Sequence, residues 1–168
     1  GFLGLWSAIR MKKTQPSLDI VLIEKSRCGS GASGRNGGLA NNWWAKYLSL
    51  LEICDESEAR RICEAAESAI DEIGEFCREH QVDAQFRVLT ENLEKHNANP
   101  FSEISPDEVR EKSGSPRMLS GIFDPNAATV QPALLARGLR RVAIKLGVRI
   151  YEETPLTNLE RSTPPIVH

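Results

Sequence analysis

The stretch GASGRNGG, Gly31 to Gly38, places four glycines among eight residues. Because glycine has no Cβ atom, such a segment lets the backbone approach a flat ligand where side chains would collide with it. The stretch follows an apolar run over residues 19–23 whose flanking residues break regular structure, which predicts a strand buried on both faces, as in a parallel sheet. We interpret the glycines as clearance for a ligand. The alternative, for the stretch taken alone, is a flexible surface loop.

A second glycine pattern opens the chain, in GFLG from Gly1 to Gly4. In dinucleotide-binding βαβ units, GxGxxG joins the first strand to the first helix, and an acidic residue about twenty residues further on binds a ribose. With Gly1 and Gly4 as the second and third glycines, a helix over residues 4–13 follows and Glu24 takes the position of the acid. The first strand would precede residue 1, so we expect a truncated unit. The alternative for Glu24 is a solvated acid at a strand end.

The composition is that of an ordinary globular chain, with 168 residues that are 40% hydrophobic and 26% charged and a net charge of -2. The near balance of charges argues against a nucleic-acid partner and a polybasic membrane anchor. No apolar run is long enough to span a bilayer and no signal peptide is recognisable, so we expect a cytoplasmic protein. The four cysteines form no CxxC pair and have no histidine cluster nearby, which predicts free thiols and no metal site.

The remaining sequence alternates helical and extended patterns, which predicts a mixed α/β fold. The strongest helix is expected over residues 55–80, where one stripe of apolar residues recurs at helical spacing. Ser105, followed by Pro106 in the first turn, predicts a short helix that runs to about Lys112. A third helix is expected over residues 132–146, with Gly147 as its stop. Strands are expected over residues 84–90, 118–123, 148–151 and 156–160, and a polar loop over residues 92–102.

Three segments in this order, GFLGLWSAI, IVLIEKS and GSGASGRNGG, resemble the N-terminal part of the FAD-dependent oxidoreductases of the D-amino-acid oxidase (DAO) superfamily. The resemblance is strongest to the bacterial gamma-glutamylputrescine oxidoreductase type, in which GASGRNGG recurs. The later segment VQPALLARGLRRVAIKLGVRIYEETPLTNLE resembles the stretch that returns the chain to the FAD-binding domain. The resemblance implies a Rossmann-like FAD-binding βαβ unit with FAD as the cofactor.

The resemblance also assigns cofactor-binding residues by position. Gly1 and Gly4 match the phosphate loop, and Glu24 matches the ribose acid. The segment over residues 33–39 matches the part that passes the pyrophosphate and the flavin, and Leu156 matches the position whose backbone meets the adenine. The residues expected to bind FAD are Gly1, Gly4, Glu24, Lys25, Ser26, Ser33, Arg35, Asn36, Gly37, Gly38, Leu39 and Leu156.

The activity that the resemblance implies is oxidation of the C–N bond of an amine or amino acid, with hydride transfer to the flavin. Residues 1–50 are then the FAD-binding portion, residues 51–130 an insertion towards the substrate domain, and residues 131–168 a truncated return to the FAD-binding domain. One alternative is an incomplete nucleotide-binding module or remnant without turnover. Another is a nicotinamide-dependent protein, which the second run of glycines argues against.

No catalytic residue is predicted, because in the family the substrate-binding part lies largely beyond the position of residue 168. His80, His96 and His168 are isolated in the sequence. Trp43 and Trp44 follow the glycine stretch and could border a substrate pocket, but packing in a core or an interface explains them better. Neither the identity of the amine nor the electron acceptor follows from these residues.

Overall fold

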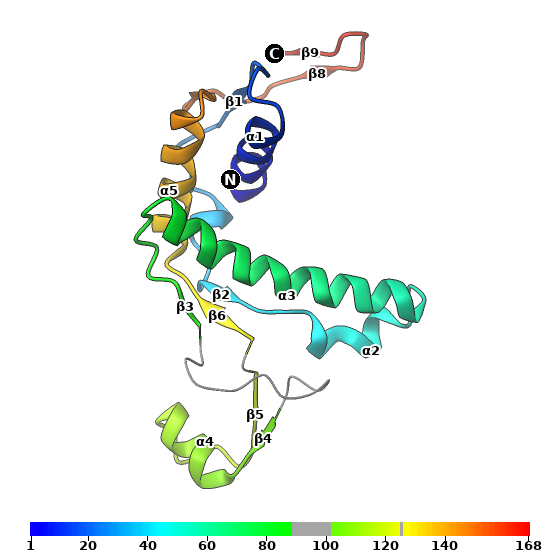
Figure 1. Ribbon diagram of the computed structural model, residues 1–168, viewed down its shortest axis with the longest axis vertical. Coiled ribbons are helices and arrows are strands. Elements are labelled where there is room, and N and C mark those ends of the chain that lie inside the picture. The colour runs from blue at the N-terminus through cyan, green and yellow to red at the C-terminus, as the bar shows by residue number, and fades with distance from the viewer. Residues whose placement is uncertain (89–101, 125) are drawn as a thin grey trace. The chain divides into compact units, whose positions relative to one another are not determined.

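The computed structural model describes residues 1–88, 102–124 and 126–168, and the chain divides into two compact units. The first unit contains residues 1–38, 75–86 and 130–168, so it includes both ends of the chain (Figure 1). The second unit contains residues 39–74 and 87–129. None of the helices in the described segments combines the length and the apolar composition that a bilayer crossing requires.

The first unit contains a small parallel sheet with two helices beside it. Strand β1 (Val21–Ile23) pairs in parallel with β7 (Arg149–Tyr151), so that Leu22 lies opposite Ile150. Helix α1 (Phe2–Thr14) and helix α5 (Pro132–Lys145) pack side by side, as the blue and orange helices of Figure 1 show. This parallel pairing confirms the predicted α/β arrangement, in which a helix precedes each strand.

Helix α5 has clear local signals at both ends. At its start, Pro132 occupies the first turn and the Gln131 side chain accepts a hydrogen bond of 2.8 Å from the Leu134 amide. After its end, Gly147 adopts a φ of 85°, a left-handed conformation that glycine tolerates best. The helix was predicted from Pro132, the spacing of its apolar residues and Gly147, and the prediction is confirmed, whereas the cap by Gln131 was not predicted.

The core of the first unit lies where the two helices face each other. Burial of each large aliphatic side chain stabilises the fold by about 1.5–3 kcal/mol. Gly138, in the middle of α5, permits a further close contact, because a Cβ atom there would lie 2.2 Å from Val82 Cγ1. The buried apolar residues of the two helices are Leu5, Ala8, Ile9, Leu135, Ala136, Leu139, Val142 and Ala143.

The prediction that β1 is buried on both faces is wrong. Leu22 packs towards α1, where a Cβ atom on Gly4 would lie 3.5 Å from its Cδ2 atom. Val21 and Ile23 point to the other face and are 46% and 38% exposed. The physical reason is that α1 covers one face of the strand, while the described residues supply no layer over the other.

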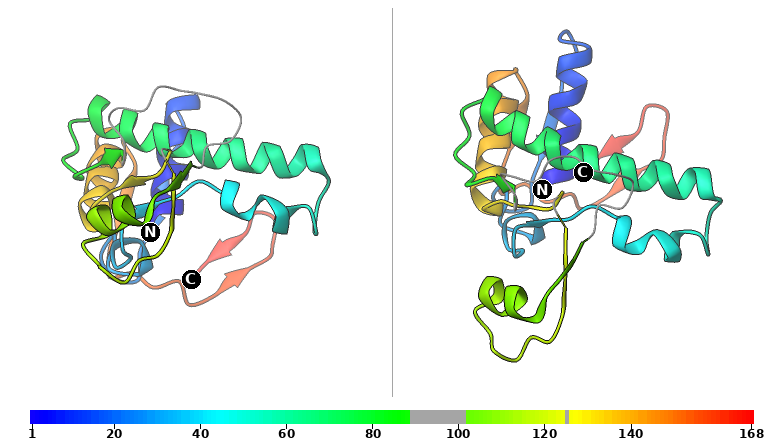
Figure 2. Two further views of the ribbon diagram at one scale, coloured as in Figure 1. Left: turned by 90° about the horizontal axis from the view of Figure 1, so that it is seen from below. Right: turned by 60° about the horizontal axis from the view of Figure 1, so that its bottom comes forward.

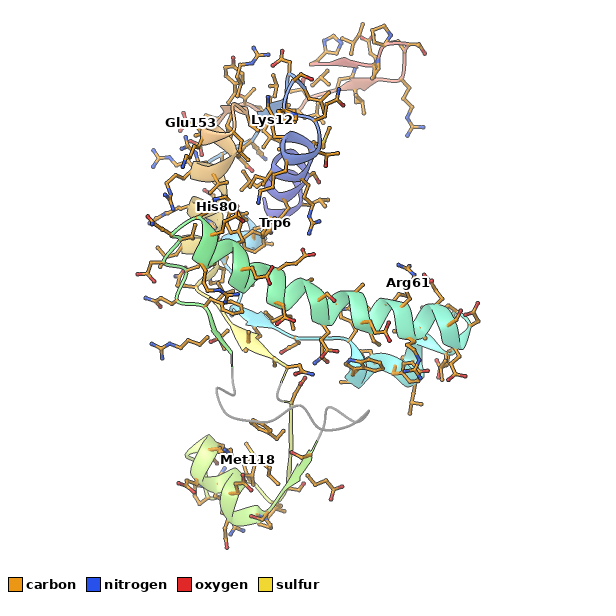
Figure 3. All side chains as sticks on the ribbon, viewed as in Figure 1. Trp6, Lys12, Arg61, His80, Met118 and Glu153 are labelled. Carbon is orange, nitrogen blue, oxygen red and sulfur yellow. The ribbon has the colours of Figure 1, made fainter. Side chains whose placement is uncertain are left out.

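The long helix α3 (Glu56–Glu79) confirms the strongest helical prediction. Asp55 precedes the helix and caps it, because its carboxylate accepts a hydrogen bond of 2.9 Å from the Glu58 amide. Its last turns belong to the first unit, where the Phe76 ring lies 4.7 Å from the Trp6 ring and 4.8 Å from the His80 ring, measured between centroids. Figure 3 labels Trp6 and His80.

The second unit contains a three-stranded antiparallel sheet in which β6 (Ala128–Thr129) lies between β2 (Leu39–Ala40) and β3 (Arg87–Val88). A short 3₁₀ turn, η2 (Trp44–Lys46), leads into helix α2 (Tyr47–Leu50). The last residue of α2 packs against the first turns of α3. This small apolar cluster contains Leu50, Ala59 and Cys63, with Trp44, Tyr47, Cys54 and Ile62 around it.

A second part of this unit is the antiparallel pair β4 (Ser102–Ile104) and β5 (Gly121–Phe123), with helix α4 (Pro106–Ser113) between them in the sequence (Figure 2). The Ser105 hydroxyl accepts a hydrogen bond of 3.3 Å from the Glu108 amide, which confirms the predicted start of the helix. Gly121 lies close beneath the helix, because a Cβ atom there would lie 2.7 Å from Val109 Cγ2.

Several predicted strands are shorter in the structure than in the sequence patterns. Of residues 84–88, only Arg87–Val88 form a strand, because Ala84 instead accepts a hydrogen bond from the Gln131 amide outside any sheet. The strand predicted over residues 156–160 is limited to β8 (Leu159–Glu160), which pairs with β9 (Ile166–Val167). Residues 89–101, including Thr90, His96 and most of the predicted polar loop, lie outside the described residues, and Ser102 begins β4.

Candidate cofactor-binding site

The N-terminus of α1 meets the glycine-rich stretch, although the residues in contact, Phe2 and Ser33, are 31 positions apart in the sequence. The Phe2 amide donates a hydrogen bond of 2.9 Å to Ser33 Oγ. This approach depends on Gly1, because a Cβ atom there would lie 2.8 Å from the same hydroxyl oxygen. A helix N-terminus presents free amides and a partial positive charge, so the predicted phosphate loop has the chemistry of an anion site.

Glu24 lies at the same place. Its Oε2 atom is 3.3 Å from the Gly1 nitrogen, and its Oε1 atom accepts a hydrogen bond of 3.1 Å from the Ser26 amide. Each oxygen retains a free lone pair, which is what a ribose hydroxyl pair requires. The structure therefore brings together Gly1, Glu24 and Ser33, three of the predicted cofactor-binding residues.

The segment that contains Leu156 approaches the residues that follow β1. The pairing of β1 with β7 continues beyond both strands: the Thr154 amide donates to the Glu24 carbonyl and the Glu153 amide donates to the Ser26 carbonyl, each at 2.9 Å. Leu156 follows two residues later and is 54% exposed. The contact of its backbone with an adenine stays a prediction.

The four glycines of residues 31–38 divide into two kinds. At Gly34 an added Cβ atom would lie 2.0 Å from the Gly29 carbonyl oxygen, and at Gly38, where φ is 75°, it would lie 2.0 Å from the Val130 carbonyl oxygen. These two glycines are required by the folded chain itself. Around Gly31 and Gly37, apart from the adjacent residues of the chain, no atom of the described residues lies within 4 Å of an added Cβ atom. The packing of the described residues does not require glycine there, so these two positions leave room for a ligand.

Asn36 shapes the loop from within. Its Nδ2 atom donates to the carbonyls of Ala32 and Ser33 in the short turn η1 (Ala32–Gly34), at 3.0 and 3.1 Å. Its Oδ1 atom accepts a hydrogen bond of 2.8 Å from the Gly38 amide. The Gly38 amide is therefore engaged within the chain, and Gly37 is the better candidate for a backbone contact with a ring edge.

Two positively charged residues belong to the predicted site: Lys25 lies shortly after β1, and Arg35 lies in the loop itself. The side chains of Lys25 and Arg35 are exposed and have no hydrogen-bond or ion-pair partner in the part of the chain that the structure describes. Arg35 immediately follows η1. Because its guanidinium group carries a fixed positive charge, it is suited to a phosphate or an anionic ring. Leu39, in contrast, begins β2 in the second unit and is 67% exposed.

The sequence interpretation missed Glu152. Its carboxylate accepts a hydrogen bond of 2.8 Å from the Cys28 amide and two hydrogen bonds of 3.1 Å from the Arg140 guanidinium. A usable signal was present, because Glu152 directly follows β7 as Glu24 directly follows β1. In a parallel pair, two acids at such positions lie at the same edge of the sheet.

The second unit has its own polar cluster. Trp44 Nε1 and Asn126 Nδ2 donate to the two oxygens of Glu67, at 2.8 and 2.6 Å. Asn42, which is 7% exposed, donates to both oxygens of Asp124. Since Trp44 also packs in the apolar cluster of this unit, the packing interpretation of this residue is confirmed, whereas Trp43 is 49% exposed.

The described histidines, His80 and His168, make their contacts elsewhere. The His80 ring makes an edge-to-face contact with the Phe76 ring, and burial lowers the pKa of His80 below the ordinary value of 6.5. The His168 ring lies 2.8 Å from Glu160 at the terminal strand pair. The four cysteines carry free thiols, and Cys63 and Cys77 are buried as small apolar residues, with pKa values raised by that burial.

The family model described as "FAD dependent oxidoreductase" (DAO) matches residues 1–167. Among curated proteins, the gamma-glutamylputrescine oxidoreductase of Escherichia coli (strain K12) is 28% identical over 189 residues, which cover 99% of this chain and 43% of that protein. The chain thus spans less than half the length of the curated relatives that it matches.

Solved structures show the same fold. An L-amino acid deaminase from Proteus vulgaris matches with a TM-score of 0.70 and 18% identity, over 99% of this chain and 46% of its own. The glycine oxidase from Bacillus cereus ATCC 14579 matches with a TM-score of 0.61 and 18% identity, over 95% of this chain and 47% of its own. The predicted family, its FAD cofactor and the predicted α/β fold are confirmed.

Proposed function

Since this chain belongs to the DAO family of FAD-dependent oxidoreductases, we propose that it forms the FAD-binding part of an enzyme that oxidises the C–N bond of an amine or amino acid. The observation that carries the proposal is the meeting of three segments at the start of α1: the Phe2 amide, the Ser33 hydroxyl and the Glu24 carboxylate. Gly31 and Gly37 leave open space in the same loop. This combination fits a dinucleotide that continues past its pyrophosphate as a flat ring.

Each of these residues has a defined task. The α1 N-terminus attracts the pyrophosphate through its free amides, and the Ser33 hydroxyl, which accepts from Phe2, still has its own proton to donate. Glu24 accepts hydrogen bonds from the ribose hydroxyls, while Arg35 adds positive charge. Gly37 and Asn36 keep side-chain bulk away from the ring. The proposed FAD-binding set also includes Gly4, Lys25, Ser26, Gly38, Leu39 and the backbone of Leu156.

The chemistry that FAD would supply when bound is an acceptor for the hydride of the carbon next to the nitrogen, so that the substrate would leave as an imine that water hydrolyses. The three similar proteins are named for gamma-glutamylputrescine, L-amino acids and glycine, all of which contain an amino nitrogen. This shared feature supports a small amine or amino acid as the substrate of the present protein. It also supports a small-molecule partner in preference to a nucleic acid.

We propose the same division of labour that the sequence suggests. Residues 1–50 and 131–168 serve the cofactor, and residues 51–130 lead towards the substrate. The two units of the chain are compatible with this proposal, since the glycine loop and α5 share one unit. The cytoplasm is the proposed location and rests on the composition alone.

The test is anaerobic reduction of bound flavin in the protein expressed from its complete reading frame. Diamines, gamma-glutamylated diamines, glycine and L-amino acids would be mixed with the FAD-loaded protein, and each would be compared with the analogue that has a hydroxyl in place of the amino group. Loss of the oxidised flavin's visible bands with an amine and not with its hydroxy analogue is the expected result. Retained flavin that no amine reduces would contradict the enzymatic proposal and favour a binding module without turnover.

A further inference from the structure

The loop before and within the glycine-rich stretch lies along one side of α5. At its far end, Gly38 packs against Val130 and Pro132 at the start of the helix. At its beginning, an added Cβ atom on Gly29 would lie 2.8 Å from the Cβ atom of Ala136, which is one turn after Pro132 in α5. One more turn along is Arg140, which reaches the loop through Glu152.

Glu152 is the charged group that connects these parts. One carboxylate oxygen, Oε1, accepts both from the Cys28 amide at 2.8 Å and from Arg140 Nε at 3.1 Å. The other oxygen accepts from Arg140 Nη2, also at 3.1 Å. Two parallel bonds between a guanidinium group and a carboxylate fix the direction of both side chains. Arg140 therefore orients Glu152, and Glu152 holds the backbone at Cys28.

A continuous chain of contacts leads from Glu152 to the candidate cofactor site. Cys28 precedes Gly29, whose carbonyl oxygen is so close to Gly34 that a Cβ atom there would collide with it. Gly34 follows Ser33, and the Ser33 hydroxyl accepts the Phe2 amide at the start of α1. A shift of the Cys28 backbone would thus be transmitted to the hydroxyl that faces the helix N-terminus.

The electrostatics agree with this role. The hydrogen bond from the Cys28 amide, with a further contribution from Arg140, lowers the pKa of Glu152, so the carboxylate is charged at neutral pH. Burial, and then the neighbouring Glu152 charge, raise the pKa of the Cys28 thiol. The thiol is therefore protonated, and Cys28 contributes to this cluster through its backbone amide and not as a nucleophile.

We propose that Glu152, oriented by Arg140, is a positioning residue for FAD binding, because its hydrogen bond to the Cys28 amide fixes the loop that carries Ser33. This inference rests on the proposed function, since the loop is taken to bind FAD. A purely structural ion pair is the competing explanation. The two differ in which bond matters, the one to Arg140 or the one to the Cys28 amide.

Three variants separate these explanations. Glu152→Ala removes the two bonds from Arg140 and the one from the Cys28 amide, whereas Glu152→Gln keeps an oxygen that can accept a hydrogen bond from the Cys28 amide. The exchange Glu152→Arg with Arg140→Glu restores an ion pair without placing an acceptor at Cys28. Asp19→Ala is the matched control, because Asp19 pairs with Arg149 at 2.6 Å beside the same two strands and does not contact the loop. The Kd for FAD would be measured by flavin fluorescence, and hydrogen exchange of residues 26–34 in the FAD-free chain.

Glu152→Ala is expected to raise the Kd for FAD about tenfold or more and to accelerate exchange in residues 26–34, because a hydrogen bond to a charged acceptor is lost. The Kd of Glu152→Gln for FAD should stay within about threefold of that of the parent chain. The double variant, Glu152→Arg with Arg140→Glu, should resemble Glu152→Ala. Asp19→Ala should leave both quantities unchanged.

Unchanged hydrogen exchange of residues 26–34 in Glu152→Ala would overturn the proposal. It would also be overturned if the double variant, Glu152→Arg with Arg140→Glu, recovered both the Kd for FAD and the hydrogen exchange of the parent chain. Faster exchange throughout the first unit would also overturn it, since Glu152 would then support the fold as a whole. If the parent chain shows no affinity for FAD, the proposed function fails, whereas the exchange data on the FAD-free chain still decide whether Glu152 fixes the loop.

Discussion

The glycine loop of the first unit and the polar cluster of the second unit are built in opposite ways. In the loop, the site is formed mainly by the backbone of residues close together in the sequence. Gly34 and Gly38 have no side chain there, because carbonyl oxygens lie against them. In the cluster, side chains from distant segments meet: Glu67 of α3 accepts from Trp44 and from Asn126. A feature made by neighbouring residues leaves a mark in the sequence, and a feature made by distant side chains does not.

The largest expected effect is at Gly38, where Gly38→Val should destabilise the chain by about 3 kcal/mol or more. The substitution forces a β-branched residue to a φ of 75° and its Cβ atom against the Val130 carbonyl oxygen. The free energy of unfolding in urea measures the loss. Gly37→Ala is the control and should change it by less than about 0.5 kcal/mol, because the added methyl group meets open space. Equal losses in the two variants would refute the division of the glycines into two kinds.

In the second unit, Glu67→Ala should cost about 2 kcal/mol, because it leaves the Trp44 indole N–H and the Asn126 amide without their acceptor. Glu64→Ala, at an exposed position one turn earlier on α3, should have little effect on the same unfolding measurement. The tryptophan fluorescence should respond to the first change and not to the second. A cost at Glu64 as large as at Glu67 would mean that the cluster contributes nothing specific.

A smaller effect is expected at His80, at the end of the same helix but in the first unit. Burial lowers the pKa of His80, so the folded chain favours the neutral ring while the unfolded chain takes up a proton near the ordinary value of 6.5. The unfolded state binds more protons below that value, so stability should fall as the pH falls through 6.5. His80→Gln should flatten this dependence, as measured by unfolding at pH 7.5 and 5.5 (about one unit on either side of the ordinary value). If the pH dependence of stability were the same in His80→Gln, other titratable groups would be its cause.

The same contrast explains how much could be predicted from the sequence. The helices over residues 56–79 and 132–145, the parallel strands and the meeting of Gly1 with Glu24 follow from local signals: caps, periodicity and glycine spacing. The exposure of Val21 and Ile23 was not predictable, because a continuous apolar run does not reveal which faces of a strand are covered.

Other features depended on contacts that no local pattern encodes. The short strands β2, β6 and β9 have only two residues each, too few for a recognisable alternation. The bond between Glu152 and the Cys28 amide joins residues 124 positions apart. Gly34 and Gly37 look alike in the sequence, and only the position of the Gly29 carbonyl oxygen distinguishes them.

The most direct test of the central claim, that the glycine loop gives clearance to a flavin, is the visible absorption of the purified chain after FAD is added and the excess removed. The chain is compared with Gly37→Ala and Gly37→Leu, whose backbone position is unstrained and open. We predict that the parent chain retains the flavin bands and that Gly37→Leu loses them while its free energy of unfolding stays the same. Equal retention of flavin by the parent chain and by Gly37→Leu would contradict the claim.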